Sequence, residues 1–142
     1  MIKHLHYIFL ITCALPYLGS AIESTDRTNI HSTQITLDKG LIGNWFIHDK
    51  PTNIKATLNL HENGNFSGHA TKAGQIIWNY SGKWWLEGNI LKYKYLKSDR
   101  LFVKPGFLDS DTVLEVNQKQ LKLKQMGGHR DGEIMIYMRN KG

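Results

Sequence analysis

The stretch that decides the fold is residues 54–70, which read IKATLNLHENGNFSGHA. Apolar and polar residues alternate on both sides of HENGN, and this is the period of a half-buried strand. Residues opposite each other in a hairpin share a face, so we expect Leu60 to face Phe66. That pairing leaves residues 62–64 as a three-residue loop whose final glycine takes the left-handed position. The stretch therefore predicts a β-hairpin with one apolar face.

The chain beyond this hairpin repeats the same pattern. Loops are expected at residues 72–74, 88–89 and 118–119, the second with the glycine-first pattern of a type II′ turn. The pairs expected to face each other inside are Ala70–Ile76, Gly68–Trp78, Phe66–Tyr80, Leu86–Leu91, Trp84–Tyr93, Gly82–Tyr95, Val116–Leu121 and Leu114–Leu123. All of these registers agree with one inward face, and this agreement is the strongest indication of the fold.

The hairpins predict the fold class. With a first strand near residues 41–48 and a last strand near 133–139, the count is about eight strands. Strands that meet in sequence without helices between them form an antiparallel meander, and closure protects the edges of such a sheet. We therefore expect an all-β, antiparallel up-and-down barrel whose long strand 75–87 bends near Gly82. An open sandwich is the alternative.

The first 21 residues are typical of a secretory signal peptide. Lys3 precedes an apolar run over residues 7–18, and small residues follow at 19–21. The run is short for a membrane-spanning helix, and the small residues fit cleavage after Ala21. We therefore expect a periplasmic or secreted protein without stable membrane insertion. A retained N-terminal anchor is the alternative.

The remaining chain is expected to have two parts. Residues 22–40 are polar and are interpreted as a flexible leader that ends in a short helical turn near residues 33–39, and residues 41–142 form the barrel domain. The single cysteine, Cys13, lies in the signal peptide, so the exported chain has neither a disulfide nor a catalytic thiol. Lipid attachment at this cysteine is an alternative, although the usual small residues are missing before it.

The charge pattern argues against nucleic acid as a partner. The sequence has 18 Lys and Arg residues and 12 Asp and Glu residues, which gives a net charge of +6. The basic residues are scattered over most of the expected strands. This distribution indicates a solvated outer face rather than a phosphate-binding patch.

The first strand resembles that of the lipocalins and of small bacterial lipocalin-like domains. Residues 43–45 read GNW, a Gly-x-Trp entry motif, and residues 78–91 are also similar to exported proteins of this kind. In that family the tryptophan closes the floor of the barrel, and an arginine at the end of the last strand packs over it. The resemblance therefore implies these roles for Trp45 and Arg139. The sequence lacks the Thr-Asp-Tyr motif and the disulfide of classical lipocalins.

The inward registers bring six aromatic residues into one interior. They are expected to line a pocket for a small apolar ligand, with two more rings from the long connection 97–111 as a lid. The expected ligand-binding residues are Phe66, Trp78, Tyr80, Trp84, Tyr93, Tyr95, Phe102 and Phe107. A barrel of about eight strands is either filled by its side chains or hollow enough for one ligand, and the sequence leaves both open.

No catalytic, metal-binding or cofactor motif is found. The histidines lack the spacing of a helical zinc site, and three converging ligands cannot be assembled, so His69 is expected simply to lie beside Thr57 on the outer face. The segment 109–111 is interpreted as a turn that starts a strand, and no nucleophile elbow or phosphate loop is present. We therefore expect a non-catalytic binding protein for a small apolar ligand. The alternative is a protein-binding module, such as an exported inhibitor or immunity protein, that acts through its leader or residues 97–111.

Overall fold

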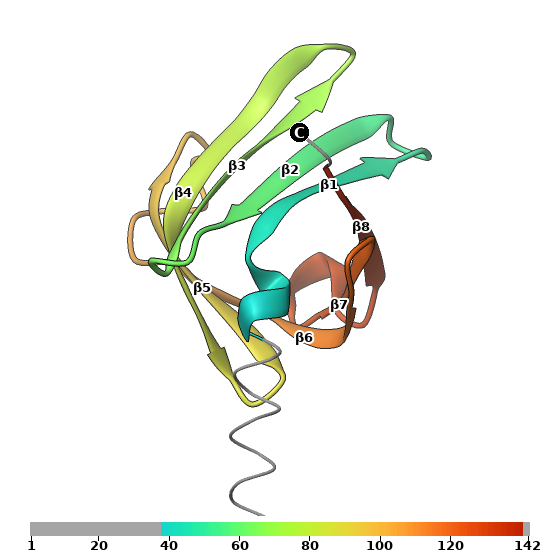
Figure 1. Cartoon of the computed structure of the whole chain (residues 1–142). Coiled ribbons are helices and arrows are strands. Elements are labelled where there is room, and N and C mark those ends of the chain that lie inside the picture. Colours follow the sequence, from blue (N-terminus) through green and yellow to red (C-terminus); the bar gives the residue numbers. More distant parts are fainter. Residues whose placement is uncertain (1–37, 141–142) are drawn as a thin grey trace, which may run out of the picture.

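Eight strands with period-two patterning close into a barrel (Figure 1). The computed structural model describes residues 38–140. The strands are β1 (Gly43–Asp49), β2 (Ile54–Leu60), β3 (Asn65–Lys72), β4 (Gln75–Glu87), β5 (Ile90–Ser98), β6 (Leu108–Val116), β7 (Gln120–Gln125) and β8 (Ile134–Arg139), with a 3₁₀ helix, η1 (Gly128–Arg130), before the last. Each strand pairs antiparallel with its sequence neighbour, and β8 also pairs with β1. The predicted up-and-down barrel is confirmed, and the open sandwich is wrong.

The chain before the barrel is described only from residue 38 onward. Residues 38–41 form a helical turn that leads directly into β1. The signal peptide predicted at 1–21 and all but the end of the leader predicted at 22–40 lie outside the described residues. Within the described part of the chain, no helix is long and apolar enough to cross a membrane.

Most of the predicted hairpin registers are confirmed. Leu60 pairs with Phe66 across β2 and β3. The β4–β5 hairpin has all three expected pairs, and Val116 pairs with Leu121 across β6 and β7. The expected bend in the long strand is also present, because the β4–β5 register shifts between Ser81 and Gly82. A Cβ at Gly82 would overlap the Lys94 carbonyl oxygen and come within 2.8 Å of the Phe66 ring, so only glycine fits there.

The predicted register between β3 and β4 is wrong. Lys72 pairs with Gln75, so the loop has two residues, and both of them have positive φ, 51° at Ala73 and 80° at Gly74. Positive φ at both loop residues is the pattern of a type I′ turn. Because Ala73 adopts the left-handed conformation, the loop closes with two residues instead of the expected three. A bulge after Ala70 then realigns the strands. As a result, the observed inward pairs are Ala70–Trp78, Gly68–Tyr80 and Phe66–Gly82.

The predicted pair Leu114–Leu123 is also wrong. The β6–β7 register shifts between Val113 and Glu115, and Val113 pairs with Leu123 instead. An extra residue in one strand turns the next side chain to the opposite face. Leu114 is therefore 46 % exposed, whereas Val113 is buried.

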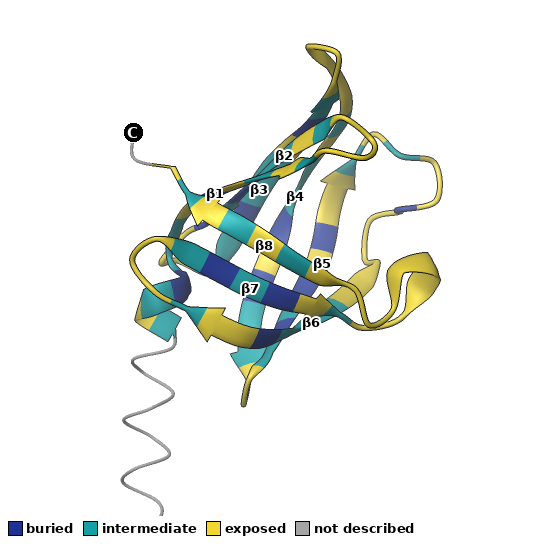
Figure 2. Ribbon diagram, turned by 90° about the vertical axis from the view of Figure 1, so that its right-hand side faces the viewer, coloured by how far each residue is buried: buried dark blue, intermediate teal, exposed yellow. Residues whose placement is uncertain are grey.

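The buried residues form one cluster inside the barrel. Figure 2 shows buried positions alternating with less buried ones along β7, as expected for a strand with one inward face. The buried cluster consists of Leu41, Trp45, Leu58, Leu60, Phe66, Trp84, Leu91, Tyr93, Tyr95, Val103, Val113, Leu121 and Leu123. Leucines therefore fill one part of the interior, and aromatic rings gather in the other.

Candidate functional site

The floor of the barrel is built by the Gly-x-Trp motif and the end of β8. The Arg139 guanidinium carbon lies 4.1 Å from the centre of the Trp45 ring, and its Nη1 and Nη2 donate hydrogen bonds of 3.0 and 2.9 Å to the carbonyl oxygens of Ile42 and Gly40. The Trp45 indole N–H donates to the Leu41 carbonyl at 2.8 Å. Arg139 thus ties the helical turn to the barrel and lies over the tryptophan, as the family resemblance implied.

The glycine of this motif has a specific role. A Cβ at Gly43 would overlap Nη1 of Arg139, and the φ of Gly43 is 145°. Both observations require glycine, since any side chain would displace the guanidinium from the carbonyls that it binds. The three separated residues Gly43, Trp45 and Arg139 therefore work as one structural unit that closes this part of the barrel.

Above the floor the barrel is hollow. A cavity of about 280 Å³ lies inside it and is lined by residues from β2, β3, β4, β5, β6, β7 and β8. Five of the predicted ligand-binding residues line this cavity, and Tyr137 of β8 joins them. These five are Phe66, Trp78, Tyr80, Tyr93 and Tyr95. The barrel is therefore filled in its lower part and hollow in its upper part.

The remaining three predicted ligand-binding residues do not line the cavity. Trp84 is part of the buried core, where its indole N–H donates to the His61 carbonyl at 3.0 Å. Phe107 lies outside the cavity with its ring centre 6.0 Å from that of Tyr95. Phe102 is 72 % exposed on the connection between β5 and β6. Arg100 is on the same connection and does line the cavity, whereas neither phenylalanine does.

The aromatic wall is held in place by ring packing and hydrogen bonds. The Trp78 and Tyr95 rings are stacked, with an interplanar angle of 18° and 6.0 Å between centres, and Phe66 meets Tyr95 edge-on at 5.3 Å. Trp78 donates its indole N–H to Ser98 Oγ at 2.9 Å, and the Tyr80 hydroxyl donates to the Thr57 carbonyl at 2.5 Å. A Cβ at Gly68 would come within 2.6 Å of the Tyr80 ring, so glycine makes room for that ring. The wall is consequently preformed.

Two carboxylates also line the cavity. Asp109 and Asp111 belong to β6, so the interpretation of residues 109–111 as a turn is wrong. Burial, and to a smaller extent the nearby Asp109 charge, raises the pKa of Asp111 to about 7, although a hydrogen bond with Tyr93 partly offsets the rise. Burial also raises the pKa of Asp109. The sequence signal for this pair was the alternation of residues 109, 111 and 113, which places all three on one face.

The cavity is also lined by four tyrosines and by Arg100. Burial raises the pKa of Tyr80, Tyr93, Tyr95 and Tyr137 above the ordinary value, so these phenols stay neutral. The Arg100 guanidinium lies 4.4 Å from the centre of the Trp78 ring. At described positions, no salt bridge involves Asp109 or Asp111.

The second arginine at the cavity, Arg130, forms ion pairs with two acidic residues that do not line the cavity. Arg130 Nε lies 2.6 Å from Glu133 Oε2, and its Nη2 lies 3.9 Å from Asp49 Oδ2. These ion pairs neutralise the charge of Arg130 outside the cavity. The interior therefore holds two carboxylates without a paired cation.

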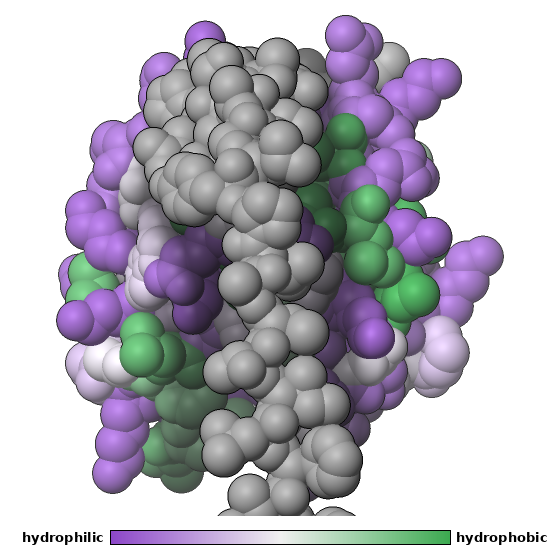
Figure 3. Space-filling model, turned by 90° about the horizontal axis from the view of Figure 1, so that it is seen from below, coloured by the Kyte–Doolittle hydropathy of each residue, from purple (hydrophilic) through white to green (hydrophobic). Residues whose placement is uncertain are grey.

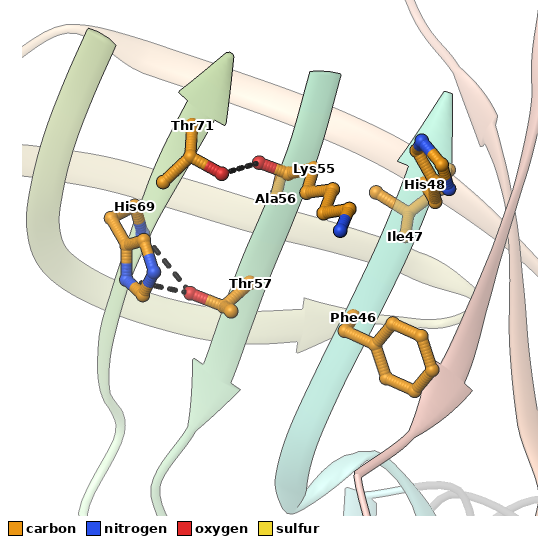
Figure 4. Close-up of a pocket in the computed structure, with 8 residues that line it drawn as sticks. All are labelled: Phe46, Ile47, His48, Lys55, Ala56, Thr57, His69 and Thr71. Atoms are coloured by element: carbon orange, nitrogen blue, oxygen red, sulfur yellow. Dashed lines mark hydrogen bonds between the residues drawn. The ribbon is translucent and has the colours of Figure 1, made fainter. Parts of the chain in front are cut away.

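A second depression lies on the outer face of β1, β2 and β3 (Figure 4). The expected neighbours are found there, since His69 Nδ1 lies 3.1 Å from Thr57 Oγ1. The Thr71 hydroxyl also donates a hydrogen bond of 3.5 Å to the Lys55 carbonyl. Between residues 38 and 140, no group of three His, Cys, Asp or Glu side chains could hold a metal ion. This depression therefore offers no metal chemistry at the residues described.

Apolar residues are exposed at several places on the described surface, among them the β5–β6 connection and β8. The connection between β5 and β6 exposes Leu101, at 94 %, together with Phe102. Ile134, Ile136 and Met138 are exposed along β8. The view from below shows hydrophilic groups over much of that face with hydrophobic groups between them (Figure 3). Apolar contact surface is thus available outside the barrel as well as inside it.

Comparison with solved structures agrees with the fold. The barrel is similar to the crystal structure of a lipocalin-like protein from Bacteroides uniformis, with a TM-score of 0.52 and 16 % sequence identity. The match covers 71 % of this chain and 99 % of that protein. No protein-family model and no curated protein sequence matches the chain. The likeness therefore agrees with a lipocalin-like fold for the eight-stranded antiparallel barrel.

Proposed function

We propose that this protein is an exported, non-catalytic binding protein that holds one small molecule in its barrel. The observation that carries this proposal is the preformed aromatic cavity of about 280 Å³. Pockets for drug-sized ligands span about 300–1,000 Å³, so this cavity suits a smaller molecule. At about 30 Å³ per water molecule it has room for about nine waters, or a ligand of about ten non-hydrogen atoms.

The shape of the wall supports a flat ligand. Trp78 and Tyr95 present stacked rings whose positions are set by neighbouring groups, so binding costs little side-chain ordering. The Asp109 and Asp111 carboxylates make the interior partly polar. We therefore replace the purely apolar ligand expected from the sequence with a molecule that has an apolar body and one polar end.

Native mass spectrometry of the protein from the exported fraction of its own host tests this function. We expect a small co-purifying mass that is released on unfolding. Ala70→Phe, which fills the cavity from β3, should abolish it, and Phe102→Ser, outside the cavity, should retain it. Circular dichroism checks the fold, and Ala56→Leu is a second filling variant. A protein-only mass for the wild type, or a ligand retained by folded filled variants, would contradict the proposal.

A second candidate function rests on the exposed connection between β5 and β6. Leu101 and Phe102 together present an apolar surface of the kind that protein partners cover. In this case Leu101→Ser with Phe102→Ser would abolish capture of a partner from the exported fraction, and Ala70→Phe would not. Loss of capture on deletion of residues 22–32 would instead favour the leader, which lies outside the described residues.

A further inference from the structure

We propose that the ligand of this cavity is a small organic cation, whose ammonium group lies beside Asp109 and Asp111 and whose carbon skeleton packs on the Trp78 and Tyr95 rings. This inference rests on the proposed function and names its substrate class. Three properties of the cavity carry it: unpaired negative charge, aromatic faces, and an acceptor without a partner.

The first property is the charge of the two carboxylates. Both lie on the inward face of β6 and line the same cavity, and no described salt bridge compensates them. Asp111 is half-buried and Asp109 is more exposed, and a charge that is partly withdrawn from water is stabilised by an opposite charge beside it. Two like charges beside each other add repulsion. A cationic ligand would relieve both costs at once.

The second property is the aromatic lining. The faces of Trp and Tyr rings attract cations electrostatically, and several rings around one charge form the usual recognition site for ammonium groups. The protein already uses this attraction at the same place, because the Arg100 guanidinium lies 4.4 Å from the Trp78 ring centre. A ligand ammonium among Trp78, Tyr95 and Asp111 would likewise lie against aromatic rings, and the Asp111 carboxylate would supply an opposite charge beside it.

The third property is the hydroxyl of Tyr95. This residue is 8 % exposed and lines the cavity, yet no residue described in the structure forms a hydrogen bond with its hydroxyl. A hydroxyl that lines a cavity without a protein partner is available to a ligand or to water. The phenol oxygen and the two carboxylates together provide acceptors, which suit the N–H donors of an ammonium group.

The remaining groups that face Asp111 do not offset its charge. Tyr93 and Tyr95 of β5, Tyr80 of β4 and Tyr137 of β8 are neutral phenols, and Gln125 of β7 is uncharged. Arg130 is paired with Glu133 and Asp49, and Arg100 lies on Trp78. Neither arginine forms a described salt bridge with Asp109 or Asp111, so both carboxylates remain available to a ligand cation.

Three probes of similar size test the inference: 2-phenylethylamine, 2-phenylethanol and 3-phenylpropanoate, titrated by calorimetry and by NMR. At about pH 8 we expect the amine to bind about tenfold or more tightly than the alcohol, since a charge-assisted hydrogen bond is added, and the carboxylate to bind most weakly. Asp111→Asn should remove most of the advantage of the amine. Glu115→Gln removes a charge from the same strand without touching the cavity, and it should leave the advantage unchanged.

A pH series on the wild-type protein gives a second readout that needs no variant. The ratio of amine to alcohol affinity should fall severalfold between about pH 8 and about pH 5.5, as Asp111 takes up a proton. If the alcohol binds and the amine has no advantage, the cation inference is wrong and the proposed function stands. Tightest binding of the carboxylate would also overturn the inference, in favour of an anion site at Arg100. If none of the probes binds, both the inference and the proposed function are wrong.

Discussion

Asp111 should make the stability of the unliganded barrel depend on pH in an unusual direction. Burial raises its pKa from 3.8 to about 7, so near pH 5.5 the folded state keeps a proton that the unfolded chain has lost. The unfolded state then binds fewer protons, and linkage makes the free energy of unfolding fall as pH rises. The stabilising effect of the proton is full below about pH 4 and is lost as the pH rises through about 7.

The magnitude follows from the size of the pKa shift. At about 1.4 kcal/mol per pKa unit, the shift corresponds to at most about 4 kcal/mol between pH 4 and pH 8. Asp111 is partly accessible from the cavity, and water there screens its charge, so we expect about 2 kcal/mol. Asp111→Asn should abolish this contribution, because the amide does not titrate.

Urea unfolding at about pH 4.5, 5.5, 6.5 and 7.5 measures this effect through the linear dependence of the unfolding free energy on denaturant. All other ionisable groups are common to the wild type and the variant, so the difference between the two proteins isolates Asp111. Glu115→Gln, on the same strand but outside the cavity, should keep the wild-type slope. Parallel pH profiles for the wild type and Asp111→Asn would refute the reasoning.

Three further predictions concern the barrel itself. Arg139→Leu should lower the unfolding free energy by about 3 kcal/mol in urea, because two backbone hydrogen bonds and the stacking on Trp45 are lost. Gly68→Ala should cost about 3 kcal/mol by the same assay, since its Cβ would meet the Thr57 carbonyl oxygen and the Tyr80 ring; Gly106→Ala, with open space around it, should cost about 1 kcal/mol from backbone strain alone. Phe102→Ser should change thermal stability by less than about 0.5 kcal/mol in a circular dichroism melt, because the ring is exposed.

Specific outcomes would contradict each of these three. Equal stability of Arg139→Leu and wild type would mean that the helical turn holds without its arginine. Equal costs of Gly68→Ala and Gly106→Ala would mean that the barrel shifts to admit a Cβ at position 68 without the steric cost that we expect. A large loss on Phe102→Ser would mean that the ring packs against the barrel.

Much of the fold could be predicted because hairpin registers are local. A loop of known length sets which residues oppose each other, and the inward face of one strand then determines that of the next. The Leu60–Phe66 and Trp84–Tyr93 pairs followed from this logic and are confirmed. The failures at Ile76 and Leu114 have different causes: the β3–β4 loop has two residues instead of the expected three, and a β-bulge without a clear sequence mark displaces Leu114.

The candidate site could be predicted only in part. Five aromatic residues of the cavity were identified, since period two alone places them inside, but Trp84 lies in the core below it. Asp109 and Asp111 were missed, because carboxylates beside a serine are typical of turns and because the inward face expected at Leu114 and Val116 turns the odd-numbered residues outward.

The sequence by itself determined the number of strands, their antiparallel order and the pairing of most hairpins, because these depend on alternation and loop length over a few neighbouring residues. Only the tertiary structure decided where the bulges lie, which part of the barrel stays hollow, and that two carboxylates share this hollow with aromatic rings. The physical reason is that burial and charge pairing depend on every strand around the closed barrel. The environment of Asp111 is set by residues from β4, β5, β7 and β8, which only closure brings together.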